Sequence, residues 1–127
     1  MKTERANSLL AEIVSSQGFI NIDQNDVDSF KANVDDIDAE KVSGKIEEIG
    51  VILDNAISSI IERNDIKQVK GLLFVIRLPQ DKCFMENIND IHEIIDKLDE
   101  ELECKWGIST MDNLQNEQFE LIVVIGF

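Results

Sequence analysis

Two aspartates three residues apart, Asp23 and Asp26, stand in the stretch GFINIDQNDVDSF at residues 18–30. A carboxylate pair can accept hydrogen bonds and protons, so it could serve the chemistry of a partner molecule. The same spacing also fits the start of a helix, with Asp23 as N-cap and Asp26 beside the positive end of the helix dipole. From spacing alone the helix start is the commoner of the two, and both interpretations stay open.

Other residue types that could do chemistry favour structural roles. The segment 36–47 has acids at positions 1, 3, 5 and 12 of a calcium-binding loop, but Lys41 stands where that loop needs glycine. We therefore expect an acidic solvated connection there and no metal site. His92, the sole histidine, has no nucleophile pattern near it. Cys83 and Cys104 lack CxxC spacing and sit in apolar settings, so both are expected to be reduced packing residues.

Composition narrows the classes of partner. The 127 residues carry 26 acids and 12 bases, a net charge of −14, which repels phosphate backbones and anionic lipid surfaces. We therefore expect no nucleic-acid partner and no membrane partner. No run of 18 apolar residues occurs, and reduced thiols fit a cytoplasmic protein. The length and the absence of a linker predict one domain over residues 1–127.

Apolar residues recur at helical spacing in four segments that would position the acid pair. The first spans residues 3–16, and a short second helix follows Asp23. The segments 45–63 and 88–102 each carry a single apolar stripe. We expect these two long helices to cover one face of a sheet. The two opening helices then cover an edge of that sheet or its other face.

Buried strands are predicted at 71–78, GLLFVIRL, and at 119–127, FELIVVIGF. A third strand at 103–109 alternates Cys104, Trp106 and Ile108 on its inward face, with the tryptophan in a buried wall, and a weaker strand is predicted around 33–42.

The order of elements predicts an α/β fold, a two-layer α+β domain with a mixed sheet of about four strands. Strand-helix-strand units predict parallel neighbours joined by right-handed crossovers. The last two strands are expected to form an antiparallel pair across the polar connection 110–118.

Four segments in order resemble the C-terminal half of FtsZ, the bacterial tubulin-like cell-division GTPase. They are GFINIDQNDV, KGLLFVIRL, FMENINDIHEIIDKL and FELIVVIGF, and the resemblance covers about residues 6–127. In that family a helix ends in a loop of pattern Gly-Leu-Ile-Asn-hydrophobic-Asp-x-x-Asp. The matching positions here are Gly18, Phe19, Ile20, Asn21, Ile22, Asp23 and Asp26. Gln24 and Asn25 make this loop more polar, and residues 33–44 lack the family's Gly-rich strand.

The resemblance implies that this loop docks in the nucleotide pocket of a neighbouring subunit. Asp23 and Asp26 would then act in trans on the water that attacks the γ-phosphate, and the partner-binding residues would be Gly18, Phe19, Ile20, Asn21, Asp23 and Asp26. We expect no counterpart of the family's N-terminal nucleotide domain, because the six glycines do not cluster as a phosphate-binding loop would require. We therefore expect no cofactor, no GTP binding and no enzymatic activity of the chain alone.

The functional prediction is an interaction module that docks on an FtsZ-type filament or associates with its own copies, capping or regulating assembly. The alternative is a free-standing α/β scaffold or homo-oligomer of unrelated binding function.

Overall fold

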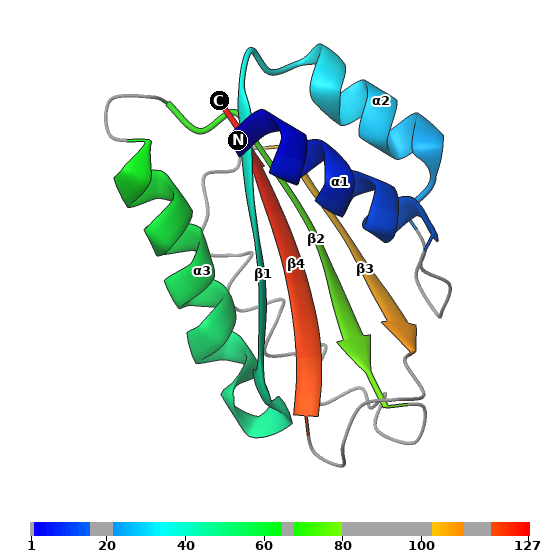
Figure 1. Cartoon of the computed structure of the whole chain (residues 1–127), viewed down its shortest axis with the longest axis vertical. Coiled ribbons are helices and arrows are strands. Elements are labelled where there is room, and N and C mark those ends of the chain that lie inside the picture. Colours follow the sequence, from blue (N-terminus) through cyan, green and yellow to red (C-terminus); the bar gives the residue numbers. More distant parts are fainter. Residues whose placement is uncertain (1, 16–21, 65–67, 80–102, 111–117) are drawn as a thin grey trace.

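The computed structural model of the protein describes residues 2–15, 22–64, 68–79, 103–110 and 118–127. Three helices, a short 3-10 helix and four strands are present in these ranges (Figure 1). In chain order they are α1 (Lys2–Ser15), α2 (Gln24–Ala32), β1 (Ile37–Lys45), η1 (Ile46–Glu48), α3 (Ile49–Arg63), β2 (Gly71–Leu78), β3 (Glu103–Thr110) and β4 (Gln118–Gly126).

The predicted elements agree with this order wherever the chain is described. The weaker strand predicted around 33–42 forms as β1, which begins and ends three to four residues later. The predicted helix 45–63 begins with η1 and continues as α3. The predicted helix 88–102, His92 and Cys83 lie outside the described residues.

The sheet has the strand order β1-β4-β2-β3. β4 runs antiparallel to both β1 and β2, whereas β2 and β3 are parallel. The predicted pairing of the last two strands with each other is therefore wrong, as is the expectation that β1 and β2 are neighbours, because β4 lies between them. The physical reason is burial. Residues 121–127 are all buried, and such a segment is best placed in the centre of the sheet, whereas the partly exposed β3 lies at an edge.

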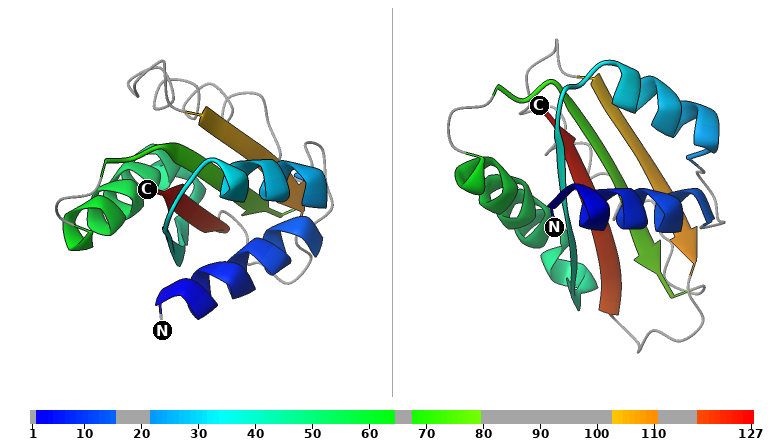
Figure 2. Two further views of the ribbon diagram at one scale, coloured as in Figure 1. Left: turned by 90° about the horizontal axis from the view of Figure 1, so that it is seen from above. Right: turned by 45° about the horizontal axis from the view of Figure 1, so that its top comes forward.

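Both faces of the sheet are covered by helices (Figure 2). Alternate residues of β2 point to opposite sides, so Leu72, Phe74 and Ile76 join the α3 cluster, while Leu73 and Val75 join the cluster under α1 and α2. The predicted packing of the 45–63 stripe on the sheet is confirmed. Of the two alternatives left open for the opening helices, the structure selects the opposite face. The predicted α+β fold with a mixed four-stranded sheet is confirmed.

β1 and α3 lie close together at Gly44. An added Cβ at Gly44 would meet Cδ1 of Ile52 on α3, so a larger residue here would require the end of the Ile52 side chain to move. On the other face of the sheet the beginning of α2 lies beside β3, where Nζ of Lys105 is 3.4 Å from Oδ1 of Asp26.

Candidate functional site

The acid pair lies at the beginning of α2 and forms a capping box. The backbone N–H of Asp26 donates to Oδ1 of Asp23 at 2.9 Å, and the backbone N–H of Asp23 donates to Oδ2 of Asp26 at 3.1 Å. Asp23 has the extended backbone of an N-cap, with φ −98° and ψ 176°. Both carboxylates thus satisfy backbone donors that the first helical turn leaves unpaired.

Apolar residues on either side of the box fix its position. Ile22 precedes it and Val27 and Phe30 follow it, and all three are buried in the cluster under α1 and α2. The acids between them therefore stay at the surface while the helix that carries them is packed on the sheet. This arrangement orients the two carboxylates without burying either one.

Lys105 of β3 adds a basic partner that the sequence interpretation missed. Its Nζ lies 3.4 Å from Oδ1 of Asp26. The hydrogen bond from the Asp23 backbone, opposed by burial and helped by Lys105, holds the pKa of Asp26 below its usual value. The signal available in the sequence was the alternation of β3, which puts Lys105 on the face opposite Cys104 and Trp106.

The two acids differ in what they can still accept. Both oxygens of Asp26 face donors, and its lowered pKa makes it a weak base. In Asp23 only Oδ1 accepts a hydrogen bond, from the backbone N–H of Asp26. Its Oδ2 accepts none from the described part of the chain. Asp23 is therefore the freer acceptor for a water molecule or for a donor on a partner.

The remaining predicted site residues are Gly18, Phe19, Ile20 and Asn21, and they lie outside the described residues. The structure therefore describes two of the six, Asp23 and Asp26, and brings these two together in the capping box. The interpretation of Asp23 as an N-cap, left open by the spacing, is confirmed.

A buried arginine, Arg77, holds the C-terminal end of α1 against the sheet. Arg77 of β2 lies 2.7 Å from Oε1 of Glu120 and donates to the backbone carbonyl of Glu12 at 3.2 Å. Lys41 adds an ion pair with Glu12 at 3.0 Å. A single charged residue inside the apolar run GLLFVIRL was the sequence signal for this contact, because a buried charge requires partners.

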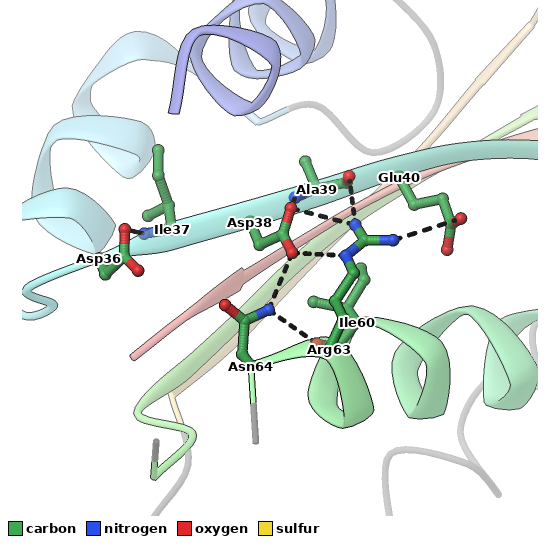
Figure 3. A network of polar contacts seen from close by, with 8 residues as sticks. All are labelled: Asp36, Ile37, Asp38, Ala39, Glu40, Ile60, Arg63 and Asn64. Atoms are coloured by element: carbon green, nitrogen blue, oxygen red, sulfur yellow. Dashed lines mark hydrogen bonds and ion pairs between the residues drawn. The ribbon is translucent and has the colours of Figure 1, made fainter. Parts of the chain in front are cut away.

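A second carboxylate site lies between β1 and α3 (Figure 3). Asp38 is 2% exposed and accepts from Nε of Arg63 at 2.6 Å and from Nδ2 of Asn64 at 2.8 Å. Burial would raise the pKa of Asp38, but the hydrogen bonds from Arg63, Asn64 and the Ala39 N–H together hold it below its usual value. The segment 36–47 was interpreted above as a solvated acidic connection, and that interpretation is wrong because the segment forms β1 and the start of η1. Asp38 itself is buried because β1 turns its side chain toward α3.

Cys104 and Trp106, predicted as buried packing residues, pack against the α3 cluster but are only partly buried. Burial raises the pKa of the Cys104 thiol to about 11, so the thiol stays protonated and unreactive at neutral pH. Trp106 stacks on Phe74 with ring centroids 6.3 Å apart and packs against the α3 cluster.

Within the described ranges, no three potential ligands gather as a metal site. In the same residues no helix is long and apolar enough to cross a membrane.

Of the comparisons with known proteins, the one with solved structures gives matches, and these concern the fold. No family model and no curated protein sequence matches the chain. Among solved structures, a point mutant of FtsZ from M. jannaschii superposes with a TM-score of 0.73 at 20% identity, covering 97% of this chain and 37% of that one. An empty FtsZ dimer from M. jannaschii gives 0.68 at 21% identity, with 97% and 36% covered. TubZ-Bt, in a helical model of its four-stranded filament, gives 0.65 at 14% identity, with 97% and 34% covered.

These likenesses cover nearly all of this chain but little more than a third of each match. At such low identity they establish the arrangement of elements, and the arrangement agrees with the resemblance seen in the sequence segments. The chain has the fold of the FtsZ C-terminal domain.

Proposed function

We propose that this protein is an interaction module that docks on an FtsZ-type filament subunit or on a second copy of itself, and so regulates assembly. The observation that carries the proposal is the fold, which matches FtsZ and the TubZ-Bt filament subunit over 97% of the chain. The exposed acid pair supports it, because Asp23 and Asp26 are held on a packed helix with Oδ2 of Asp23 open to a partner.

Docking would use residues 18–26, the segment that resembles the FtsZ loop. In this mode the module occupies the exposed nucleotide pocket of a terminal subunit, and the glycines of residues 1–127 form no phosphate-binding loop for the next one. Filaments should therefore become shorter. The chain itself lacks a cluster of glycines for phosphate, so its part in any GTP hydrolysis would be to supply acids in trans.

The acid variants separate docking from hydrolysis. Asp23→Asn preserves the cap, because asparagine is as good an N-cap as aspartate. Asp26→Asn keeps an oxygen that can accept from the Asp23 backbone. Both variants should therefore fold and dock, while GTP hydrolysis stimulated in trans should fall at least tenfold. Asp28→Asn is the matched control, since Asp28 is an exposed acid on the same helix that bonds Gln24 instead of joining the cap.

The experiment adds each variant in several-fold excess to full-length FtsZ from the same organism. Co-sedimentation reports docking, light scattering reports filament length, and phosphate release reports hydrolysis. Sedimentation equilibrium of the protein alone reports self-association, and a GTP titration should give no binding in the micromolar range. Absence of both FtsZ binding and self-association would contradict the proposal and favour a scaffold of unrelated binding function.

A further inference from the structure

The outer edge of β1 is divided into a blocked half and an open half. Asp36 and Phe127 exchange two backbone hydrogen bonds, at 3.1 and 2.8 Å. Because bonded pairs alternate along an antiparallel ladder, the even-numbered residues of β1 bond β4. The odd-numbered residues then direct their N–H and C=O groups away from the sheet, as the edge strand of the order β1-β4-β2-β3 requires.

Side chains block the first half of this edge. The N–H of Ile37 donates to Oδ1 of Asp36 at 3.0 Å, and the N–H of Ala39 donates to Oδ1 of Asp38 at 2.8 Å. Nη2 of Arg63 donates to the carbonyl of Ala39 at 3.0 Å (Figure 3). No strand can pair there without displacing these contacts, and covering an edge in this way protects a sheet from unwanted pairing.

The second half of the edge carries no such cover. Lys41, Ser43 and Lys45 are exposed, and their outward N–H groups have no partner among the residues that the structure describes. The C=O groups of Lys41 and Ser43 are open as well, whereas Lys45 is the N-cap of η1 and its C=O accepts the first bond of that helix. Three N–H and two C=O groups are thus available in a row, at the spacing that an added strand requires. Val42 and Gly44, between them, face α3, so the opposite side of an added strand would meet small apolar groups.

Charge indicates the kind of strand that fits. Residues of an incoming strand lie directly opposite Lys41, Ser43 and Lys45 and share their face of the sheet. In antiparallel pairing with a second copy centred on Ser43, Lys41 of each copy would face Lys45 of the other, and like charges directly opposite are destabilising. If the second copy were instead paired nearer the start of β1, it would have to displace the hydrogen bond from Arg63 to the carbonyl of Ala39.

We propose that the edge of β1 at residues 41–45 is a docking site for an extended acidic segment of a partner protein. The segment has two acids four residues apart, opposite Lys41 and Lys45, with small apolar residues at the alternate positions. Lys45 has no ion-pair partner in the described chain, whereas Lys41 already contacts Glu12 and Glu120, so Lys45 contributes more to recognition. This site is separate from residues 18–26 and does not depend on the function proposed above.

The probe is a fluorescent peptide with the core Glu-Val-Thr-Val-Glu, capped at both ends and titrated with the full chain. Its control has lysine in place of both glutamates. The acidic peptide should bind at least tenfold more tightly than the lysine peptide, and hydrogen exchange at the amides of Lys41, Ser43 and Lys45 should slow when it binds. The amides of Ile37 and Ala39 should be protected with or without peptide, because side chains already hold them.

Ser43→Pro removes one outward N–H and no bond to β4, a change that an edge strand tolerates. It should weaken peptide binding at least tenfold with a cooperative melt retained. Ser43→Ala keeps the N–H and should bind as the native chain does. Lys45→Glu should weaken binding of the acidic peptide and improve binding of the lysine peptide.

Equal binding of the two peptides, or no binding of either, would overturn the proposal. Protection of the three edge amides that rises with protein concentration in the absence of peptide would assign the edge to a second copy and overturn it as well. Should Ser43→Pro fail to fold, the exchange measurement on the native chain still decides.

Discussion

A pair of aspartates at the surface and a single buried aspartate differ in exposure to solvent, and this difference determines what each can do. Asp23 and Asp26 form an exposed capping box at the start of α2, held by backbone N–H groups and by Lys105 at 3.4 Å. Asp38 is 2% exposed and bonded by Arg63, Asn64 and the Ala39 N–H. The exposed pair remains accessible to a partner, whereas the buried carboxylate is committed to joining β1 with α3.

The cost of losing a contact to each carboxylate depends on how much of its hydration the carboxylate keeps. A charge at the surface keeps much of its hydration, so losing one contact there costs little. A buried carboxylate has given up its hydration and depends on its protein donors, so losing one of them leaves a charge without compensation. Each experiment below tests this contrast by removing one donor or acceptor from one of the two groups.

The largest effect is expected from Arg63→Ala. This change leaves Asp38 buried with one fewer cationic donor and opens the carbonyl of Ala39, and should cost about 2–3 kcal/mol of unfolding free energy. Urea denaturation gives the value. Glu62→Ala, an exposed neighbour on the same helix, is the control and should stay within about 0.5 kcal/mol of the native chain. Equal stability of the two variants would remove the contrast between the buried and exposed groups.

A smaller effect is expected at the cap. Asp23→Ala removes the acceptor for the Asp26 N–H and should cost about 1 kcal/mol, whereas Asp23→Asn should cost only a few tenths. Thermal melts of both variants against the native chain provide the test. A loss for Asp23→Ala as large as that for Arg63→Ala would mean that the capping box is as important for the fold as the buried site.

The smallest effect is expected from Lys105→Ala, at less than about 1 kcal/mol, since the pair with Asp26 is partly exposed and weak. Its clearer signature is in pH dependence. Asp26 has a depressed pKa in the folded state, so below the unfolded value the unfolded chain binds more protons and stability falls as pH falls through the folded pKa. Lys105→Ala should raise the pKa of Asp26 in the folded state, so that less stability is lost as the pH falls. Carbon-13 NMR of the carboxyl groups reports it, with Asp38 as an internal reference that should not move.

Much of the fold could be read from the sequence because it depends on periodicity. The run GLLFVIRL has no polar alternation, which requires a strand buried on both faces, and β2 is such a strand. The stripe of residues 45–63 requires one apolar contact face, and α3 has it. The N-cap at Asp23 is a local feature within one helical turn, so spacing was enough to indicate it.

The order of the strands and the location of the charges were decided by tertiary structure. Periodicity indicates that a strand is buried but not which strands lie beside it. The position of β4 between β1 and β2, and not beside β3, therefore could not be predicted from the pattern. Asp38 and Asp23 look alike in the sequence, each an acid next to an apolar residue. Only the approach of α3 to β1 brings Arg63, Asn64 and the buried side of Asp38 together across 25 to 26 residues, because hydrogen-bond partners at that separation are set by packing and not by local pattern.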